Sequence, residues 1–222
     1  MNTQTSRLSV FLFLLLAIMI LFSGCSTLNT QYKNANGVEL YSSGQYAQAI
    51  EVFQSNINAN PEDADAYYNI GAIYHQLGRV NRDTNQYAQA EQYYRAALGK
   101  NPNHSPAYRG LSVWYMEQNR QDDAFTLLKN WNTLSPDLSD PKIELARLYQ
   151  ETGQNRDAID CLSATLALDP RNARALRALG YLREAGQEYD QALVNYRNSL
   201  QYNPAQPDLT ARVASLESQL VK

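Results

Sequence analysis

The chain carries few residues that could perform catalysis, and their spacing matches no catalytic motif. The histidines are His75 and His104, and the cysteines are Cys25 and Cys161. The sequence contains no His-Glu-x-x-His pattern of a zinc protease, no Gly-x-Ser-x-Gly pattern of a serine hydrolase and no phosphate-binding loop. We therefore predict a protein that is not an enzyme and that needs no cofactor and no metal.

Three of these four residues are expected to have structural roles. His75 follows a tyrosine in a predicted helix, where it should be solvated in a groove, and His104 should lie in a loop. Cys161 lies in another predicted helix, where a partly buried packing thiol is the simplest interpretation. A redox sensor or an intermolecular disulfide is the alternative for this cysteine.

The fourth residue, Cys25, follows a segment that is typical of a signal peptide. Residues 8–22 are almost wholly apolar, and these fifteen residues are fewer than the about 20 that a membrane-spanning helix needs. The sequence Ser23-Gly24-Cys25 resembles the lipobox of bacterial lipoproteins, although Phe22 stands where leucine is usual. That resemblance implies cleavage of residues 1–24 and acylation of the cysteine with fatty acids such as palmitate.

The same resemblance predicts where the protein is located. In Gram-negative lipoproteins, a serine such as Ser26 directly after the lipidated cysteine favours sorting to the outer membrane, here with the chain facing the periplasm. Residues 25–33 would then carry the lipid and form a short tether. An ordinary secretory signal with an incidental cysteine and an uncleaved membrane anchor are the alternatives.

Composition excludes two further classes of protein. The chain has 222 residues, enough for one or two domains, and a formal net charge of −3. Its basic residues form no stripe, so we expect no nucleic acid as a partner. Only 18% of the residues are charged and 16 are tyrosines, which argues against a disordered acidic tail.

A repeat with a period near 34 residues runs through the rest of the chain. Its markers are Pro61, Pro102, Pro136, Pro170 and Pro204, the first interval being 41 residues. Alanine stands twelve positions before each proline, and a large apolar or aromatic residue stands eight positions before it. Because helices approach closely only where their contact residues are small, this pattern predicts helix pairs that stack on one another.

The segment over residues 64–74, Ala-Asp-Ala-Tyr-Tyr-Asn-Ile-Gly-Ala-Ile-Tyr, resembles the first helix of a tetratricopeptide repeat (TPR). The resemblance implies an all-α solenoid of about five helix-turn-helix units, wound into a right-handed superhelix over residues 34–204. The units are expected at 30–63, 64–104, 105–138, 139–172 and 173–206. A capping helix should follow over 207–222, with an apolar stripe formed by Leu209, Val213, Leu216 and Leu220.

Helix ends are predicted from residue types that favour them. Left-handed residues that end a first helix are expected at Gly44, Gly78, Asn119 and Gly153, whereas Gly186 comes one residue early for this role. Ser105 and Asp140 precede prolines, as helix N-caps do. The seven extra residues of the second unit fall at about 79–85, where Asp83 and Gln86 resemble a capping box.

In TPR proteins the first helix of each unit lines a concave groove, and its inward positions share one helical face. Here the candidate partner-binding residues are Val38, Tyr41, Tyr68, Asn69, Ala72, His75, Arg109, Val113, Met116, Arg147, Arg174, Arg177 and Tyr181. The arginines could grip a carboxylate-bearing peptide, and the tyrosines could supply rigid contact area. A generic solvated groove with scattered charges is the alternative.

Two further features of the surface bear on the choice of partner. The carboxylate clamp of chaperone-binding TPR proteins uses Lys, Asn, Asn, Lys and Arg, and of these positions only Asn69 fits, so that clamp is not expected. Arg79 and Arg82, in the insertion, could form a second contact site, or the insertion could be tolerated loop variation.

These features together predict a lipid-anchored periplasmic scaffold that binds other envelope proteins. The sequence resembles the outer-membrane TPR lipoproteins of type IV pilus biogenesis, which escort secretin subunits. An adaptor for peptidoglycan-cleaving enzymes, or an accessory subunit of outer-membrane β-barrel assembly, would have the same features. A module that binds a cell-wall ligand, or a self-associating structural protein, is the alternative from another class.

Overall fold

The computed structural model describes residues 34–220, and this part of the chain is helical with no strand. The expected all-α repeat fold is confirmed. The predicted signal peptide, the lipid-bearing Cys25 and the tether lie outside the described residues. The chain divides into two compact units with a boundary between Ala107 and Tyr108, and each unit is described by itself.

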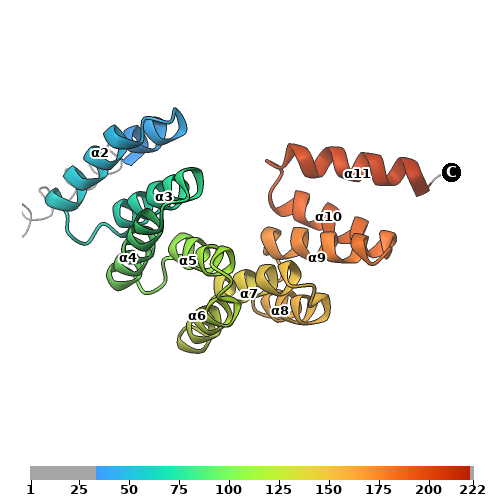
Figure 1. The fold of residues 1–222 in the computed structure, drawn as a ribbon. Helices are drawn as coiled ribbons and strands as arrows, with labels where there is room; N and C mark the ends of the chain where they lie inside the picture. The colour runs from blue at the N-terminus through green and yellow to red at the C-terminus, as the bar shows by residue number, and fades with distance from the viewer. Residues whose placement is uncertain (1–33, 221–222) are drawn as a thin grey trace, which may run out of the picture. The chain divides into compact units, whose positions relative to one another are not determined.

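The first unit begins with helical residues 34–42, which are followed by three helices (Figure 1). These are α2 (Tyr46–Ala59), α3 (Ala64–Asn81) and α4 (Thr84–Lys100). Their core contains Ala49, Phe53, Ile57, Ala66, Ile70 and Ile73. The small residues allow neighbouring helices to approach closely, and the large ones fill the space between them.

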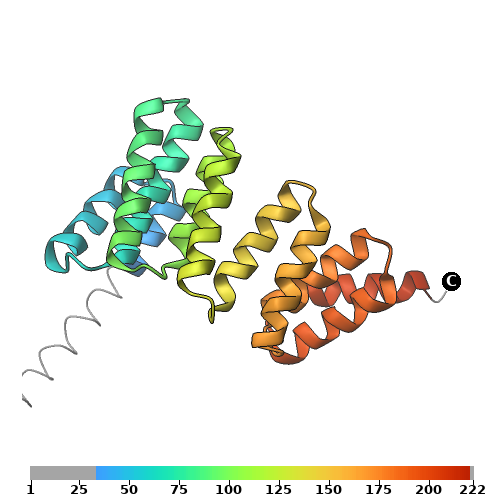
Figure 2. The same cartoon turned by 90° about the horizontal axis from the view of Figure 1, so that it is seen from below.

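The second unit continues the same alternation of helices. Helix α5 (Ser105–Glu117) contains the boundary, and the helices that follow are α6 (Gln121–Leu134), α7 (Ser139–Glu151), α8 (Asn155–Leu168), α9 (Ala173–Ala185), α10 (Tyr189–Tyr202) and α11 (Pro207–Leu220). Consecutive helices such as α7 and α8, or α9 and α10, run antiparallel (Figure 2). One core cluster joins α7, α8 and α9 through Ala146, Ala158, Leu162 and Leu179, among others.

Helix α11 covers the last repeat. Leu209, Val213 and Leu216 are buried against the Tyr196 side of α10. Leu220, the last residue of the predicted stripe, is 45% exposed, so the contact with α10 stops one turn before the helix ends.

The turns between paired helices confirm three of the four predicted left-handed residues. Gly44, Asn119 and Gly153 have φ values of 77°, 57° and 78°. The prediction for Gly78 is wrong, because α3 continues through it to Asn81, and the left-handed residue is the C-cap Arg82, with a φ of 54°. In the last repeat the left-handed residue is Gln187, with a φ of 62°, and not its neighbour Gly186.

The insertion in the second repeat lengthens both of its helices. Helix α3 has 18 residues and α4 has 17, whereas α7 has 13 and α8 has 14. Asp83 caps α4 as predicted, since its carboxylate accepts a hydrogen bond from the Asn85 backbone N–H at 2.8 Å. The reciprocal half of the capping box is absent from this turn, because Gln86 accepts from the Asn81 side chain at 3.0 Å.

Two other helix starts differ from the prediction. Helix α7 begins at Ser139, so Asp140 is its second residue rather than its N-cap. At the start of α5 the capping side chain is His104, whose Nδ1 accepts a hydrogen bond from the Ala107 N–H at 3.1 Å, and not Ser105. The prolines at 106 and 141 are tolerated because they fall in the first turn, where backbone N–H groups have no helical partner.

No helix within residues 34–220 has both the length and the apolar character needed to cross a membrane.

Candidate protein-binding pocket

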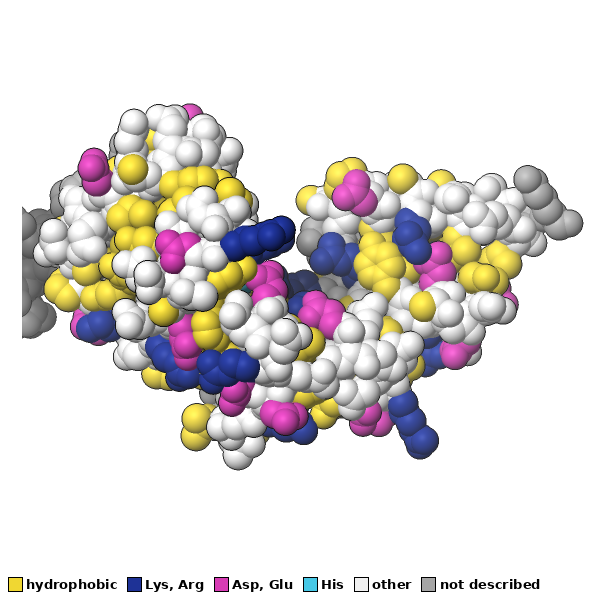
Figure 3. Space-filling view, viewed as in Figure 1, with side chains coloured by type: hydrophobic (Ala, Val, Ile, Leu, Met, Phe, Trp, Pro, Cys, Tyr) yellow, Lys and Arg dark blue, Asp and Glu magenta, His cyan; other side chains and the backbone are white. Residues whose placement is uncertain are grey.

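A pocket of about 270 Å³ lies in the second unit, between first helices of successive repeats. Its lining residues are Arg109 from α5, Ile143, Ala146, Arg147 and Gln150 from α7, Leu162 from α8, and Arg174, Arg177, Ala178 and Tyr181 from α9. Figure 3 shows basic and hydrophobic side chains side by side over α9. Five of the predicted partner-binding residues, the four arginines and Tyr181, are thus brought together in one pocket.

Glu144 contacts three of the arginines that line the pocket, and its side chain is fully buried. Arg109 donates from Nε to Glu144 Oε2 at 3.0 Å, and Arg147 donates from Nε to the same oxygen at 3.2 Å. Arg174 Nη2 donates to Glu144 Oε1 at 3.1 Å. A single carboxylate therefore fixes three guanidinium groups that come from three different helices.

Burial raises the pKa of the Glu144 carboxyl, but hydrogen bonds and positive charge from Arg109 and Arg147 outweigh burial and hold this pKa below its ordinary value. The buried carboxylate is therefore ionised at neutral pH. An ionised carboxylate is tolerated inside a protein only when cationic groups that donate hydrogen bonds to it balance its charge, as the arginines do here.

Two of these arginines also contact exposed carboxylates. Arg174 Nη1 donates to Asp140 Oδ1 at 2.7 Å, and Arg147 donates to Glu151 one turn further along α7. Arg147 Nη2 donates in addition to the Ser112 hydroxyl at 2.8 Å. These contacts restrict the rotamers of both side chains, so the guanidinium groups are held ready for a ligand.

Arg177 is placed differently from the other three arginines. Its Nη1 donates to the side-chain oxygen of Gln206 at 3.3 Å, and Gln206 is itself buried. The Gln206 amide nitrogen donates to the Asn203 carbonyl at 2.8 Å and to the Ser199 hydroxyl at 3.1 Å. The Arg177 guanidinium is therefore oriented by a neutral amide, which does not balance its charge.

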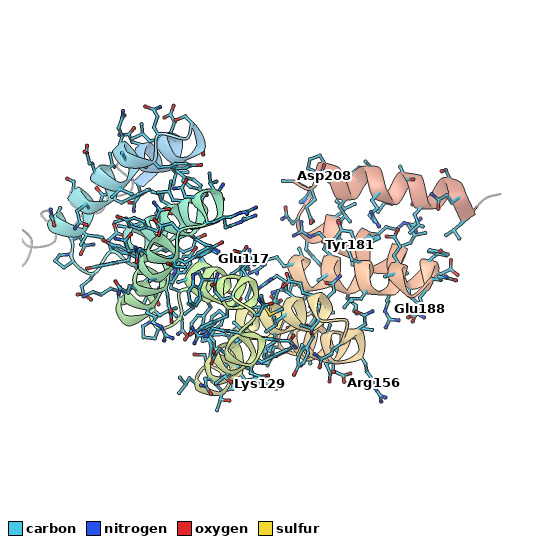
Figure 4. The ribbon with its side chains drawn as sticks, viewed as in Figure 1. Glu117, Lys129, Arg156, Tyr181, Glu188 and Asp208 are labelled. Atoms are coloured by element: carbon cyan, nitrogen blue, oxygen red, sulfur yellow. The ribbon has the colours of Figure 1, made fainter. Side chains whose placement is uncertain are left out.

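Tyr181 closes the pocket one turn after Arg177, and Figure 4 marks its place on α9. Its ring lies 5.4 Å from the ring of Tyr196, edge to face, and Arg212 lies over it at 5.1 Å. Arg212 also donates to both oxygens of Glu184, at 2.7 and 2.9 Å. These contacts tie the end of the pocket to the capping helix α11.

The candidates in the first unit form an aromatic surface instead. Tyr41 and Tyr68 are half-buried, as are Asn69 and Ala72, and Val38 is 45% exposed. The Tyr68 ring lies 5.9 Å from Tyr94 and 5.5 Å from His104. This surface offers apolar area with phenol groups and carries little charge.

His75 was predicted to be solvated, and this is wrong. Its side chain is only 7% exposed, and its Nδ1 lies 3.2 Å from the Tyr94 hydroxyl. The ring also lies between Tyr87 and Tyr94, with ring centres 5.9 and 6.0 Å apart. The long helices of the insertion bring these tyrosines from α4 over the histidine.

His104 lies in the loop before α5, as expected, but it is buried and paired. Because its Nδ1 accepts from the Ala107 backbone, Nε2 carries the proton and donates to Asp65 Oδ1 at 2.9 Å. That hydrogen bond lowers the pKa of the Asp65 carboxyl. The pair joins α3 to the start of α5 within the first unit.

The remaining candidates lie outside the pocket. Val113 and Met116 are half-buried on α5 and are not among the pocket's lining residues. Arg79 and Arg82 are exposed at the end of α3, where the insertion lengthens that helix. Cys161 is partly buried in α8, in accord with a packing thiol, and burial raises the pKa of its thiol.

Glu144 is the residue of this site that the sequence reasoning missed. It stands eight residues after Pro136, just as Asn69 stands eight after Pro61 and Gly110 eight after Pro102. An acidic residue there, between apolar neighbours in a helix, was the available signal.

No group of three histidine, cysteine or acidic side chains within residues 34–220 is arranged to hold a metal ion. The geometry instead suits recognition of an anion. Paired helices that stack in series and present a cationic pocket from their first helices define a helical-repeat binding protein.

The comparisons with known proteins identify the repeat. Family models described as TPR repeat or tetratricopeptide repeat match residues 37–78, 81–132 and 143–207. The crystal structure of TTC0263, a thermophilic TPR protein in Thermus thermophilus, has a TM-score of 0.62 at 25% identity, covering 84% of this chain and 98% of that one. The chain belongs to the tetratricopeptide-repeat family. Membership of this family supports a role as a scaffold for protein–protein interaction.

Two further similarities are more limited. The structure of PilF from Pseudomonas aeruginosa has a TM-score of 0.55 at 18% identity, covering 85% of this chain and 84% of that one, which shows a shared fold. The BBSome complex member BBS4 of Bos taurus is 28% identical over 180 residues, or 80% of this chain. The chain spans about a third of the length of that curated relative, since the match covers 33% of it.

Proposed function

We propose that this TPR protein is a lipid-anchored scaffold of the bacterial cell envelope, and that it binds an acidic segment of a partner protein in the arginine pocket. The observation that carries the binding role is the convergence of Arg109, Arg147, Arg174 and Arg177 on one pocket. Arginine forks bind carboxylates through two parallel hydrogen bonds, which gives both affinity and orientation.

The envelope location is supported by the first residues of the sequence. Residues 8–22 have the length and composition of a signal-peptide core, and Cys25 follows two small residues. One acyl chain binds a membrane only marginally, whereas two or three hold a protein firmly. A tether that ends near residue 33 would keep the TPR units close to that membrane.

The pathway we favour is assembly of an envelope machine, such as pilus or secretin biogenesis. The similarity in fold to PilF is compatible with this pathway but does not specify it. An adaptor for peptidoglycan-cleaving enzymes and an accessory subunit of outer-membrane β-barrel assembly would use the same pocket with a different partner. All three roles require a protein partner and no turnover of a substrate.

A capture experiment tests the binding role. The full chain and its Arg177→Glu variant serve as baits for envelope proteins solubilised in detergent, with Arg156→Glu as the matched control. Arg156 is exposed on α8 and points away from the helix (Figure 4). A secretin or pilus protein that is captured by the native chain and the control, but lost with Arg177→Glu, would support the proposal.

The other outcomes of this experiment are equally informative. Capture of a cell-wall hydrolase or of a barrel-assembly component would keep the scaffold role and replace the pathway. Equal capture by all three baits would place the contact outside the arginine pocket. Failure of every bait to retain a protein would contradict the scaffold role.

The anchor is tested separately with Cys25→Ser. If the lipobox interpretation is right, this variant accumulates in the soluble fraction, while the native chain sediments with membranes. A variant that still sediments with membranes and resists extraction would show that the cysteine is not the point of attachment.

A further inference from the structure

A second pocket in the second unit lies between α6 and α8, the second helices of successive repeats. It has a volume of about 480 Å³ and shares no lining residue with the arginine pocket. Its lining comes from three helices and includes Asp122, Phe125, Lys129, Tyr149, Gln154 and Asp157. The three residues from α6 are spaced i, i+3 and i+7, so they share one face of that helix. The proposed scaffold role leaves this pocket without a function.

Two aromatic rings supply the apolar part of this second pocket. The ring centres of Phe125 and Tyr149 lie 4.9 Å apart, and the rings are tilted by 46°. Both side chains are half-buried, so packing holds the rings in place while part of each remains open to solvent. All other lining residues are polar or charged. A ligand that fits must therefore present a small apolar face to the rings and polar groups at the edges of that face.

The polar side chains around the rings have hydrogen-bonding capacity to spare. Within residues 34–220, no hydrogen bond or ion pair joins the carboxylate of Asp122 or Asp157 to another residue. Gln154 donates from Nε2 to the Thr152 hydroxyl at 2.9 Å, which leaves its side-chain oxygen as an acceptor. These acceptors are exposed and hydrated in the free protein, so a ligand must replace their water molecules with hydrogen bonds of its own.

Lys129 places a cation over the same rings. Its ammonium lies 5.3 Å from the centre of the Phe125 ring and 6.0 Å from that of Tyr149, and Figure 4 marks its place on α6. This ammonium would repel a cationic ligand at the rings, and the two carboxylates would repel an anionic one. Neutral hydroxyl groups satisfy both signs of charge, because a hydroxyl donates to a carboxylate and accepts from an ammonium.

We propose that this second pocket binds a neutral carbohydrate, with one sugar ring against Phe125 and Tyr149 and its hydroxyl groups donating to Asp122 and Asp157. The C–H groups of a sugar ring carry small positive charges and pack on the negative face of an aromatic ring. Its hydroxyls extend from the edge of the ring, where the carboxylates can accept from them. The volume of about 480 Å³ lies within the ~300–1,000 Å³ of pockets that hold small ligands.

The inference adds a binding site to the proposed scaffold and does not depend on the arginine pocket. Most residues of the arginine pocket come from the first helices α5, α7 and α9, whereas α6 and α8 supply most of the second pocket. The chain would then hold a partner protein at one site and a glycan at the other.

Calorimetric titration of the full chain, in a detergent without a sugar headgroup, tests the proposal. The probes are two uncharged trisaccharides, cellotriose and N-acetylated chitotriose, and the cationic peptide Gly-Arg-Gly with both ends blocked. We expect at least one trisaccharide to bind with a Kd below about 1 mM, and the peptide not to bind. The two sugars have the same linkage and differ in acetamido groups, so their relative affinity shows whether the Gln154 oxygen accepts from an amide N–H.

Two variants locate the bound sugar. Asp157→Ala should weaken binding at least about tenfold, the loss expected when a hydrogen bond to a charged group is removed. Phe125→Leu keeps an apolar side chain but removes a ring face, and it should weaken binding about threefold or more. Asp160→Ala is the matched control, since Asp160 is exposed on α8 and does not line the pocket. Each variant must retain the native far-ultraviolet circular dichroism, and Asp157→Ala decides if Phe125→Leu does not.

Three outcomes would overturn the proposal. The first is that neither trisaccharide binds the native chain. The second is that Asp157→Ala binds the sugar as well as Asp160→Ala does. The third is that the peptide binds and the sugars do not, which would assign the second pocket to a basic segment of a protein. None of these outcomes bears on the capture experiment with Arg177→Glu, because that experiment concerns the arginine pocket.

Discussion

Arg109 and Glu144 are 35 residues apart in the sequence, yet two guanidinium nitrogens of the arginine donate to the carboxylate of the glutamate. The contact joins the first helices of two successive repeats. It also places a full negative charge where the side chain is 0% exposed. The repeat interface in the second unit therefore depends on an ion pair as well as on apolar packing.

Removal of this charge should destabilise the protein. Glu144→Gln keeps the side-chain volume but leaves Arg109, Arg147 and Arg174 facing a neutral amide. Breaking a fully buried pair costs about 3–5 kcal/mol. Here the exposed fractions of Arg109 and Arg174 are 51% and 43%, so solvent screens part of the loss and we expect about 2–3 kcal/mol.

Urea unfolding followed by circular dichroism measures this loss. Glu151→Gln is the matched control, since Glu151 contacts Arg147 but is 45% exposed, and its effect should stay below about 1 kcal/mol. Equal effects of the two substitutions would show that burial of Glu144 does not matter.

The Glu144 carboxylate should also make the free energy of unfolding depend on pH. The pKa of Glu144 is lower in the folded chain than its ordinary value, so folding favours the ionised form. The resulting stabilisation is fully present above the unfolded-state pKa of about 4.3 and is lost as the pH falls through the lower folded pKa. Asp65, whose pKa is lowered by His104, adds to the same trend.

The measurement is the urea midpoint between neutral pH and about pH 3. The midpoint of the native chain should fall on the acid side of about pH 4.3, and that of Glu144→Gln should fall less steeply. A midpoint that rises as the pH is lowered would contradict the assigned direction of both pKa values.

The close contact between Gly180 and Tyr196 leaves no room for a larger side chain at position 180. A Cβ atom on Gly180 would lie 2.3 Å from Tyr196 Cε1, and the tyrosine is fully buried, so its ring cannot swing into solvent. Gly180→Ala should therefore cost about 1–3 kcal/mol through overpacking.

The matched control is Gly99→Ala on α4, where nothing lies within 4 Å of the added carbon. There the substitution should stabilise the helix by about 0.5–1 kcal/mol, because glycine is a poor helix former. The two alanine variants should thus shift the thermal midpoint in opposite directions, and a shift in the same direction would contradict the packing argument.

Much of the fold could be predicted from the sequence because the repeat period reports packing directly. Alanine twelve residues before each proline, as at Ala158 before Pro170, marks a position that is fully buried in the structure. Large residues eight before the prolines, such as Phe53 and Tyr196, are fully or nearly fully buried as well. A helix pair cannot bury these positions in any other register, so the spacing specifies the architecture.

The site was less predictable, because its side chains meet across repeats. The repeat pattern predicted that the four arginines face the groove, but it did not show that Glu144 accepts hydrogen bonds from three of them. Nor did it show that Tyr94 reaches His75, since that contact depends on the lengthened helices of the insertion. Which charges remain for a ligand is decided by such tertiary contacts, and periodicity carries no information about them.

The turn at Gln187 illustrates a case in which repeat position overrides residue type. Asn119, Gly153 and Gln187 are spaced by 34 residues and all have positive φ, although Gly186 is the residue that usually takes this conformation. A left-handed residue other than glycine costs about 1–2 kcal/mol, and glycine's greater freedom in the unfolded chain offsets up to about 1 kcal/mol. Gln187→Gly should therefore stabilise the protein by about 0.5–1 kcal/mol in urea unfolding. Gln201→Gly, on the exposed face of α10, should instead destabilise it by a similar amount, and stabilisation by both substitutions would show that the φ of residue 187 is not the cause.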